Sequence, residues 1–96
     1  MSYVIVHTFP GGTEEQYQAA LAAVHPGLDQ LPPGQLLHYA GPSAAGWTIV
    51  AVHDSKESWE TFRDETLLPV FESGIEGSFA GPPDEIAFQP ATELSA

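Results

Sequence analysis

The first apolar stretch of the chain has the composition of a β-strand. Residues 2–9 are rich in β-branched and aromatic side chains, and Pro10-Gly11-Gly12 follows them. This pattern predicts a strand from Ser2 to Phe9. Because successive side chains point to opposite faces of a strand, one face would carry four of them: Tyr3, Ile5, His7 and Phe9.

Helical spacing of apolar residues follows directly. Tyr17, Ala20, Leu21 and Val24 recur at intervals of three and four. Thr13 and Gln16 have the spacing of a capping box, so we expect a helix from Thr13 to about Val24. Pro26-Gly27 would end it, and His25 would lie beside its last carbonyl groups.

A second helix is predicted after Ser55, which is a suitable N-cap residue. Its core positions are Trp59 and Phe62, and Pro69 is expected to break or kink it. Residues 74–83 contain three glycines and two prolines, and they predict a loop.

The remaining apolar stretches predict three more strands, at 35–41, 46–54 and 84–89. Pro42-Ser43-Ala44-Ala45 would be a four-residue hairpin loop between the first two. If that hairpin pairs Gly41 with Gly46, His38 lies opposite Ile49.

The order of elements is β-α-β-β-α-β, within one domain over residues 1–96. Right-handed crossovers then favour a four-stranded antiparallel sheet of order 4-1-3-2, with both helices on one face. The bare face would expose residues such as Tyr3, Ile5 and Phe9, or Trp47, Ile49 and Ala51, depending on the register. Since the first and third strands are apolar on both faces, the sheet needs cover on both sides, which predicts a homodimer.

Charge narrows the range of partners. Thirteen acidic residues stand against only Lys56 and Arg63, which gives a formal charge of −11. Two basic residues cannot form a phosphate-binding patch, so nucleic acid and anionic membrane surfaces are excluded. No apolar run reaches the ~20 residues of a membrane span, and residues 1–7 lack the basic start of a signal peptide. We therefore expect a soluble, cytoplasmic chain whose guest is neutral or apolar.

Histidines are the best candidates for catalytic or metal-binding residues, because the chain contains no Cys and no phosphate-cradling glycine loop. His7, His38 and His53 fall on strands. His38 and His53 would be about four residues apart along the hairpin, or ~13 Å, so a three-histidine metal site is not expected. His38 lies in mid-strand among apolar neighbours, where it could act as a neutral general base or simply form structural hydrogen bonds.

Aromatic residues offer a second candidate feature. They either fill the core or line an apolar pocket between sheet and helices, open towards the segment from Leu67 to Phe79. Arg63 either anchors an anionic group of a guest or pairs with Glu60 on the helix surface. The candidate pocket residues are His7, Tyr39, Trp47, Trp59, Phe62, Arg63 and Phe71.

The chain resembles the dimeric α/β-barrel superfamily of antibiotic-biosynthesis-monooxygenase-like proteins, and in particular its short actinobacterial members. The resemblance covers nearly the whole chain and implies a ferredoxin-like α+β fold that forms a homodimeric barrel. The matching pieces are Phe9-Pro10-Gly11-Gly12-Thr13, Pro33-Gly34, His38, Ala40-Gly41-Pro42, Gly46-Trp47, Asp54-Ser55-Lys56-Glu57-Ser58-Trp59, Phe62, Glu65, Leu67 and Pro69.

The resemblance implies a cofactor-independent enzyme of secondary metabolism. Its substrate would be hydrophobic, aromatic or polyketide-like, its chemistry of monooxygenase or cyclase type, and His38 its general base. Quinone-forming and haem-degrading members typically use an Asn, whereas this chain contains none, and residues 55–73 contain no His for haem. The alternative is a non-catalytic homodimeric module that binds a small hydrophobic ligand or assists a partner enzyme.

Overall fold

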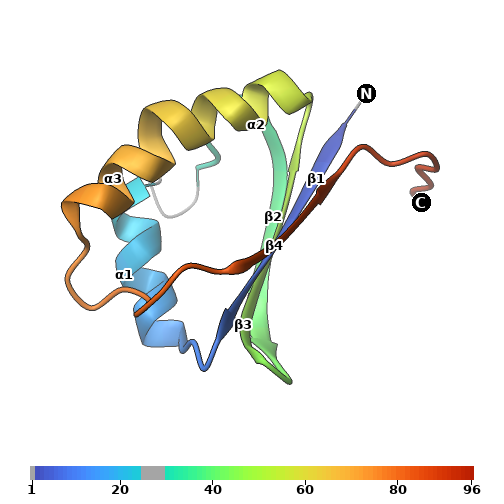
Figure 1. Ribbon diagram of the computed structural model, residues 1–96. Coiled ribbons are helices and arrows are strands. Elements are labelled where there is room, and N and C mark those ends of the chain that lie inside the picture. The colour runs from blue at the N-terminus through green and yellow to red at the C-terminus, as the bar shows by residue number, and fades with distance from the viewer. Residues whose placement is uncertain (1, 25–29) are drawn as a thin grey trace.

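A computed structural model describes residues 2–24 and 30–96 (Figure 1). Its strands and helices follow the predicted β-α-β-β-α-β order, with the second helix divided into three consecutive segments. In chain order the elements are β1 (Tyr3–Pro10), α1 (Glu14–Val24), β2 (Gln35–Ser43), β3 (Gly46–His53), α2 (Lys56–Phe62), η1 (Arg63–Leu67), α3 (Leu68–Ser73) and β4 (Asp84–Phe88).

The four strands form one antiparallel sheet in the order β2-β3-β1-β4, which confirms the predicted topology. Helix α1 and the helix formed by α2, η1 and α3 both lie on the same side of this sheet, and its other side carries no helix in the described part of the chain (Figure 1). The fold is therefore ferredoxin-like α+β.

Both helix starts are capped as predicted. At α1 the backbone N–H of Gln16 donates to Thr13 Oγ1 over 3.3 Å, and the N–H of Thr13 donates to Gln16 Oε1 over 3.0 Å. At α2 the N–H of Ser58 donates to Ser55 Oγ over 3.0 Å. These local bonds satisfy backbone donors that no helical carbonyl can reach. The predicted end of the first helix, with His25 and Pro26-Gly27, lies outside the described residues.

Of the break or kink predicted at Pro69, the structure excludes the break, because the helix continues through Pro69 to Ser73. Residues Arg63–Leu67 form a π-helical turn, in which the N–H of Leu68 donates to the carbonyl of Arg63, and α3 continues through Pro69. A proline ring normally clashes with the carbonyl four residues earlier. The wider π turn immediately before Pro69 accommodates the ring, so the helix continues to Ser73.

The β2–β3 hairpin is tighter than predicted. Ser43 pairs with Gly46, so only Ala44 and Ala45 connect the strands. Gly46 has φ of +149° and lies against the turn that follows β1, where a Cβ atom would overlap the Phe9 carbonyl. The glycine thus permits the close approach of the hairpin to that turn.

The hairpin register also differs from prediction. His38 lies opposite Ala51, not Ile49, and a β-bulge interrupts the pairing between Gln35 and Leu37. A bulge adds one residue to its strand, which reverses the alternation of side chains across that point. Gln35 and His38, three residues apart, consequently point to the same face.

The helix-covered face of the sheet forms the core. Its most deeply buried side chains include Ile5, Phe9, Trp47, Ala51 and His53. Two sets of residues were predicted as alternatives for the bare face, one from the first strand and one from the third. Both predictions are wrong, because both sets lie on the helix-covered face. Paired residues of β1 and β3 share a face, so these two sets lie together beneath the helices.

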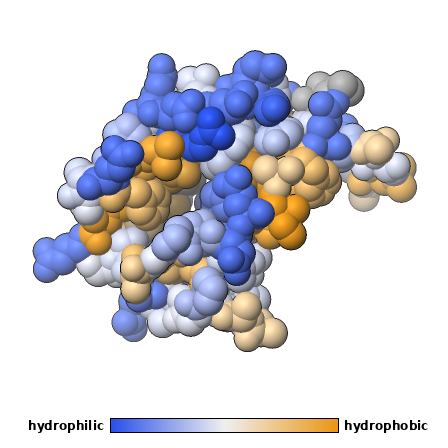
Figure 2. Space-filling view, viewed as in Figure 1, coloured by the Kyte–Doolittle hydropathy of each residue, from blue (hydrophilic) through white to orange (hydrophobic). Residues whose placement is uncertain are grey.

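The bare face carries the intervening residues and is also apolar. Tyr39, Ile86 and Phe88 are 68%, 63% and 45% exposed, and Val4 and Val6 pair directly with two of them. Figure 2 shows apolar side chains gathered beside β4 on this side of the sheet. The prediction of a sheet that is apolar on both sides is confirmed for the described residues.

Within residues 2–24 and 30–96, no helix has the length and apolar composition that crossing a bilayer requires.

Candidate functional site

A cavity of about 450 Å³ lies between the sheet and the helices. Its walls come from all four strands on one side and from α1, α2, η1 and α3 on the other, and the segment 79–83 borders it. Six of the eight predicted site residues line it: His7, His38, Trp59, Phe62, Arg63 and Phe71.

Two predicted site residues lie elsewhere. Tyr39 points to the bare face, because neighbours in a strand face opposite sides and His38 points to the cavity. Trp47 is buried below the cavity wall, where its ring packs on Tyr17 with centroids 5.2 Å apart. Trp47 therefore supports the wall without lining it.

Tyr17 and His38 form the central polar pair of the cavity. The Tyr17 hydroxyl lies 2.6 Å from His38 Nε2, and the two rings are stacked at 5.9 Å. Tyr17 comes from α1 and His38 from β2, so the bond joins a helix to the sheet. Burial raises the pKa of Tyr17, which keeps its hydroxyl protonated at neutral pH.

Gln35 connects this pair to a second histidine. Its Oε1 lies 3.1 Å from His38 Nδ1, and its Nε2 lies 3.2 Å from His53 Nε2. Gln35 is 7% exposed, and the bulge after it brings its amide to the face that His38 occupies. The predicted separation of His38 and His53 by about four residues is wrong, because one amide bridges the two imidazoles.

His53 ends this network against α2. Its Nδ1 lies 2.8 Å from Ser58 Oγ, and no part of His53 is exposed. Gly34, with φ of +84°, packs so closely on Ser58 that a Cβ atom at residue 34 would overlap the hydroxyl. Burial lowers the pKa of His53, against a smaller opposing effect of Asp54, so the imidazole is neutral near pH 7.

The buried His53 makes stability depend on pH. Below its ordinary pKa of 6.5 the unfolded chain binds a proton that the folded chain excludes. The free energy of unfolding should therefore fall as the pH is lowered from 6.5, by at most ~1.4 kcal/mol per pH unit from this group. Urea denaturation between pH 7.5 and 5.5 measures the slope. His53→Gln should show a smaller slope, and an equal slope in both proteins would contradict this account.

On β1, His7 forms a second polar pair in the cavity. Its Nε2 lies 2.7 Å from Glu85 Oε2 on the neighbouring β4. The His7 ring makes edge-on contacts with Trp59 at 5.8 Å and Phe9 at 6.4 Å, so aromatic rings surround it. The cavity thus has one polar pair on β1–β4 and another on β2–α1, with apolar surface between them.

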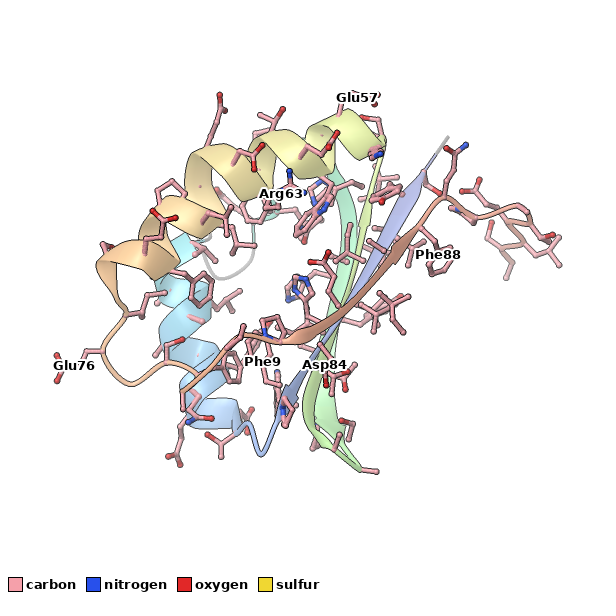
Figure 3. The ribbon with its side chains drawn as sticks, in the orientation of Figure 1. Phe9, Glu57, Arg63, Glu76, Asp84 and Phe88 are labelled. Carbon is pink, nitrogen blue, oxygen red and sulfur yellow. The ribbon has the colours of Figure 1, made fainter. Side chains whose placement is uncertain are left out.

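Arg63 pairs with acidic residues of its own helix and also lines the cavity. The guanidinium donates to both carboxylate oxygens of Asp64, over 2.9 and 3.3 Å, and lies 3.9 Å from Glu60. These acids, Asp64 first, raise the pKa of Arg63. The side chain also lines the cavity, on the inner side of the helix in Figure 3. A guest anion at this position would compete with Asp64.

The mouth of the cavity is apolar and lies at α3. Leu68 and Phe71 line the cavity and are 46% and 37% exposed. Figure 2 shows apolar side chains gathered around this helix. On the opposite rim, Phe79 stacks on Phe9 with centroids 3.7 Å apart, which holds the 74–83 segment against the sheet. A flat aromatic guest would meet ring faces and edges throughout.

Among residues 2–24 and 30–96, no cluster of three or more His, Asp or Glu has the arrangement of a metal site.

Sequence reasoning missed four of the polar residues that build the site: Gln35, Ser58, Glu85 and the hydroxyl of Tyr17. One signal for Gln35 was available, since a long polar side chain opens an otherwise apolar strand directly after Pro33-Gly34. The others depend on pairings between distant segments, which the sequence pattern does not specify.

Comparison with known proteins gives no matching family model and no matching curated protein. Solved structures do match. Rv0793 from Mycobacterium tuberculosis has a TM-score of 0.66 at 16% identity, with 98% of each chain covered.

Two further matches carry functional descriptions. A protein from Chloroflexus aurantiacus, described as a proposed antibiotic biosynthesis monooxygenase, has a TM-score of 0.63 at 18% identity, with 99% of this chain and 98% of that chain covered. The ActVA-Orf6 monooxygenase of Streptomyces coelicolor, in complex with nanaomycin D, has a TM-score of 0.57 at 17% identity, with 99% and 91% covered. At these identities the likeness concerns the fold, and this chain therefore has the ferredoxin-like fold of the antibiotic biosynthesis monooxygenase-like proteins.

Proposed function

We propose that this chain is a cofactor-independent enzyme of secondary metabolism that acts on a hydrophobic, aromatic or polyketide-like substrate by monooxygenase- or cyclase-type chemistry. The observation that carries the proposal is the Tyr17–His38 pair in an aromatic-lined cavity of about 450 Å³. That volume lies within the range of small-molecule sites, and its few polar groups suit orientation of an otherwise apolar guest.

His38 is the proton acceptor in this proposal, and Tyr17 stands between it and the substrate. A phenol or enol of the substrate gives its proton to Tyr17 Oη while the Tyr17 proton moves to His38 Nε2, over the 2.6 Å hydrogen bond. The net result is an enolate or phenolate in the cavity and an imidazolium at His38. Water-poor surroundings and the nearby positive charge stabilise the anion.

The anion can then react in one of two ways. With dioxygen as co-substrate, a doubly benzylic CH₂ becomes a carbonyl group while the second oxygen atom leaves as water. In a cyclisation, the enolate carbon attacks a carbonyl carbon of the same molecule, and the resulting alkoxide takes the proton back from His38. Neither route needs a cofactor, and both begin with the same proton transfer.

The experiment is turnover of anthrone-type phenols and cyclisable polyketide mimics, followed by product analysis and oxygen uptake. His38→Ala should lower kcat by ~100- to 10,000-fold, which is the usual contribution of a general base. Tyr17→Phe should also lower kcat, because the relay loses its middle group. Ser43→Ala, on the hairpin remote from the cavity, is the control and should retain parental turnover. A fully active His38→Ala protein would remove the proposed base.

One observation favours a non-catalytic binding module instead. The Nε2 atom of His38 already has the Tyr17 hydroxyl as partner, which is also the geometry of a structural histidine. Trp59 lines the cavity, so its fluorescence should respond to a bound aromatic ligand. Saturable quenching with no product from any of these compounds would support the module, and conversion would support the enzyme.

The homodimer belongs to the same proposal. A second copy packed face to face would cover the apolar side of the sheet that carries Tyr39, Ile86 and Phe88. Such a two-fold contact uses the same surface on both copies and leaves each cavity open at α3.

A further inference from the structure

Four hydrogen bonds in series run from the cavity into the interior of the protein. They join five side chains in the order Tyr17, His38, Gln35, His53 and Ser58, with separations of 2.6, 3.1, 3.2 and 2.8 Å. The first three members line the cavity, and His53 is completely buried behind it. The proposed proton transfer uses only Tyr17 and His38, so Gln35, His53 and Ser58 must contribute in another way.

The direction of each bond follows from the amide of Gln35. Its Oε1 can only accept, so His38 must carry its proton on Nδ1, and Nε2 is left to accept the Tyr17 hydroxyl. The Gln35 NH₂ group can only donate, so His53 Nε2 must be an acceptor. His53 then carries its proton on Nδ1 and donates it to Ser58 Oγ.

Rotation of the amide by 180° would reverse this order. An NH₂ group facing His38 would require Nδ1 to accept, and the proton of His38 would move to Nε2. In that tautomer Nε2 can no longer take a proton from Tyr17. The tautomer of a histidine is set by the partner of its other nitrogen, and for His38 that partner is the oxygen of the Gln35 amide.

We propose that Gln35 and His53 are positioning residues that hold His38 in the Nδ1–H tautomer, with its Nε2 lone pair directed at Tyr17. Ser58 completes the arrangement by accepting from His53, and Gly34 fixes Ser58 by close packing. The series acts through orientation and does not conduct protons, because an amide group does not readily give up and regain one. Its effect on turnover rests on the proposed function, whereas its effect on the tautomer does not.

The tautomer can be measured directly by ¹⁵N NMR of the imidazole rings. The parent protein should show His38 protonated on Nδ1 with a free-electron-pair shift at Nε2. His53→Phe keeps an aromatic ring beside Trp59 and Phe62 but removes the acceptor of the Gln35 NH₂ group. The amide then loses its preferred direction, and the His38 resonances should move towards the Nε2–H form.

Substitutions at Gln35 give a matched pair. Gln35→Leu removes the acceptor for His38 Nδ1–H and should also shift the tautomer. Gln35→Glu keeps an oxygen acceptor at that position and should retain Nδ1–H, so it is the rescue variant. With a turned-over substrate, kcat should fall ~10- to 100-fold in His53→Phe and Gln35→Leu, with little change in KM, by analogy with the partners that orient metal-bound histidines. Gln35→Glu should recover most of kcat, and Ser43→Ala should match the parent.

Two results would overturn the proposal. One is a parent protein in which His38 carries its proton on Nε2, and this measurement needs no variant to fold. The other is an unchanged His38 tautomer in folded His53→Phe or Gln35→Leu, with folding verified by circular dichroism and urea denaturation. If the tautomer shifts as expected but no compound is converted, the positioning role stands and the proposed enzyme function fails.

Discussion

Alanine in place of Trp59 is expected to lower the free energy of unfolding by ~3–5 kcal/mol, the usual cost of truncating a buried tryptophan. Trp59 is 4% exposed and lies where α2 meets the sheet. Its ring contacts His7, His53 and Phe62, with centroids 5.8, 5.7 and 6.3 Å away. The substitution therefore removes the packing of both interior histidines as well as burial of the indole itself.

Urea denaturation followed by far-UV circular dichroism measures this loss. Leu94→Ala is the control, because Leu94 is 91% exposed and its truncation should change stability by less than ~0.5 kcal/mol. A loss below ~1 kcal/mol for Trp59→Ala would mean that the helix does not pack on the sheet as described.

A lysine at position 86 is expected to abolish the proposed homodimer. Ile86 is 63% exposed on the bare face of the sheet, opposite Val6 of β1. Face-to-face packing would bury it, and an unpaired buried charge costs several kcal/mol, commonly ~3–5. The dissociation constant should then rise by more than ~100-fold, since each 1.4 kcal/mol is a factor of ten.

Sedimentation equilibrium at micromolar concentration decides this point. The parent should sediment at twice the chain mass of 10.3 kDa and Ile86→Lys at one chain mass. Leu94→Lys introduces the same charge on the exposed C-terminal segment and should remain dimeric. A parent that sediments as a stable single chain would refute the dimer, whatever the variants do.

Much of the fold could be predicted because local signals mark its boundaries. Thr13 and Ser55 begin the two helices through bonds to residues three positions later, and proline or glycine separates most elements. The hairpin register could not be predicted in this way. A bulge changes the count of residues by one without a distinctive sequence, and Leu36 does not differ from an ordinary strand residue.

The site was predicted less completely, for a related reason. His38 was identifiable as a polar residue in mid-strand, and Trp59 and Phe62 by their helical spacing. The bonds of His38 to Tyr17 and Gln35 depend on the packing of α1 and on the bulge. Tyr39 does not line the cavity, because a strand directs adjacent residues 38 and 39 to opposite faces of the sheet.

The π turn before Pro69 is another feature that the local sequence pattern does not predict. Proline normally ends a helix, and the sequence pattern accordingly predicts an interruption there. One wider turn over Arg63–Leu67 removes the conflict and carries the helix to Ser73. The cavity mouth at Leu68 and Phe71 exists because of this continuation.

The irregular pairing of β2 has a consequence for how copies of this chain can meet. β2 is an outermost strand of the sheet, and a long regular outermost strand is a template on which further strands polymerise. The extra residue near its start and Pro42 near its end both interrupt the row of outward amide groups. Addition of a further strand along this border of the sheet is thereby discouraged.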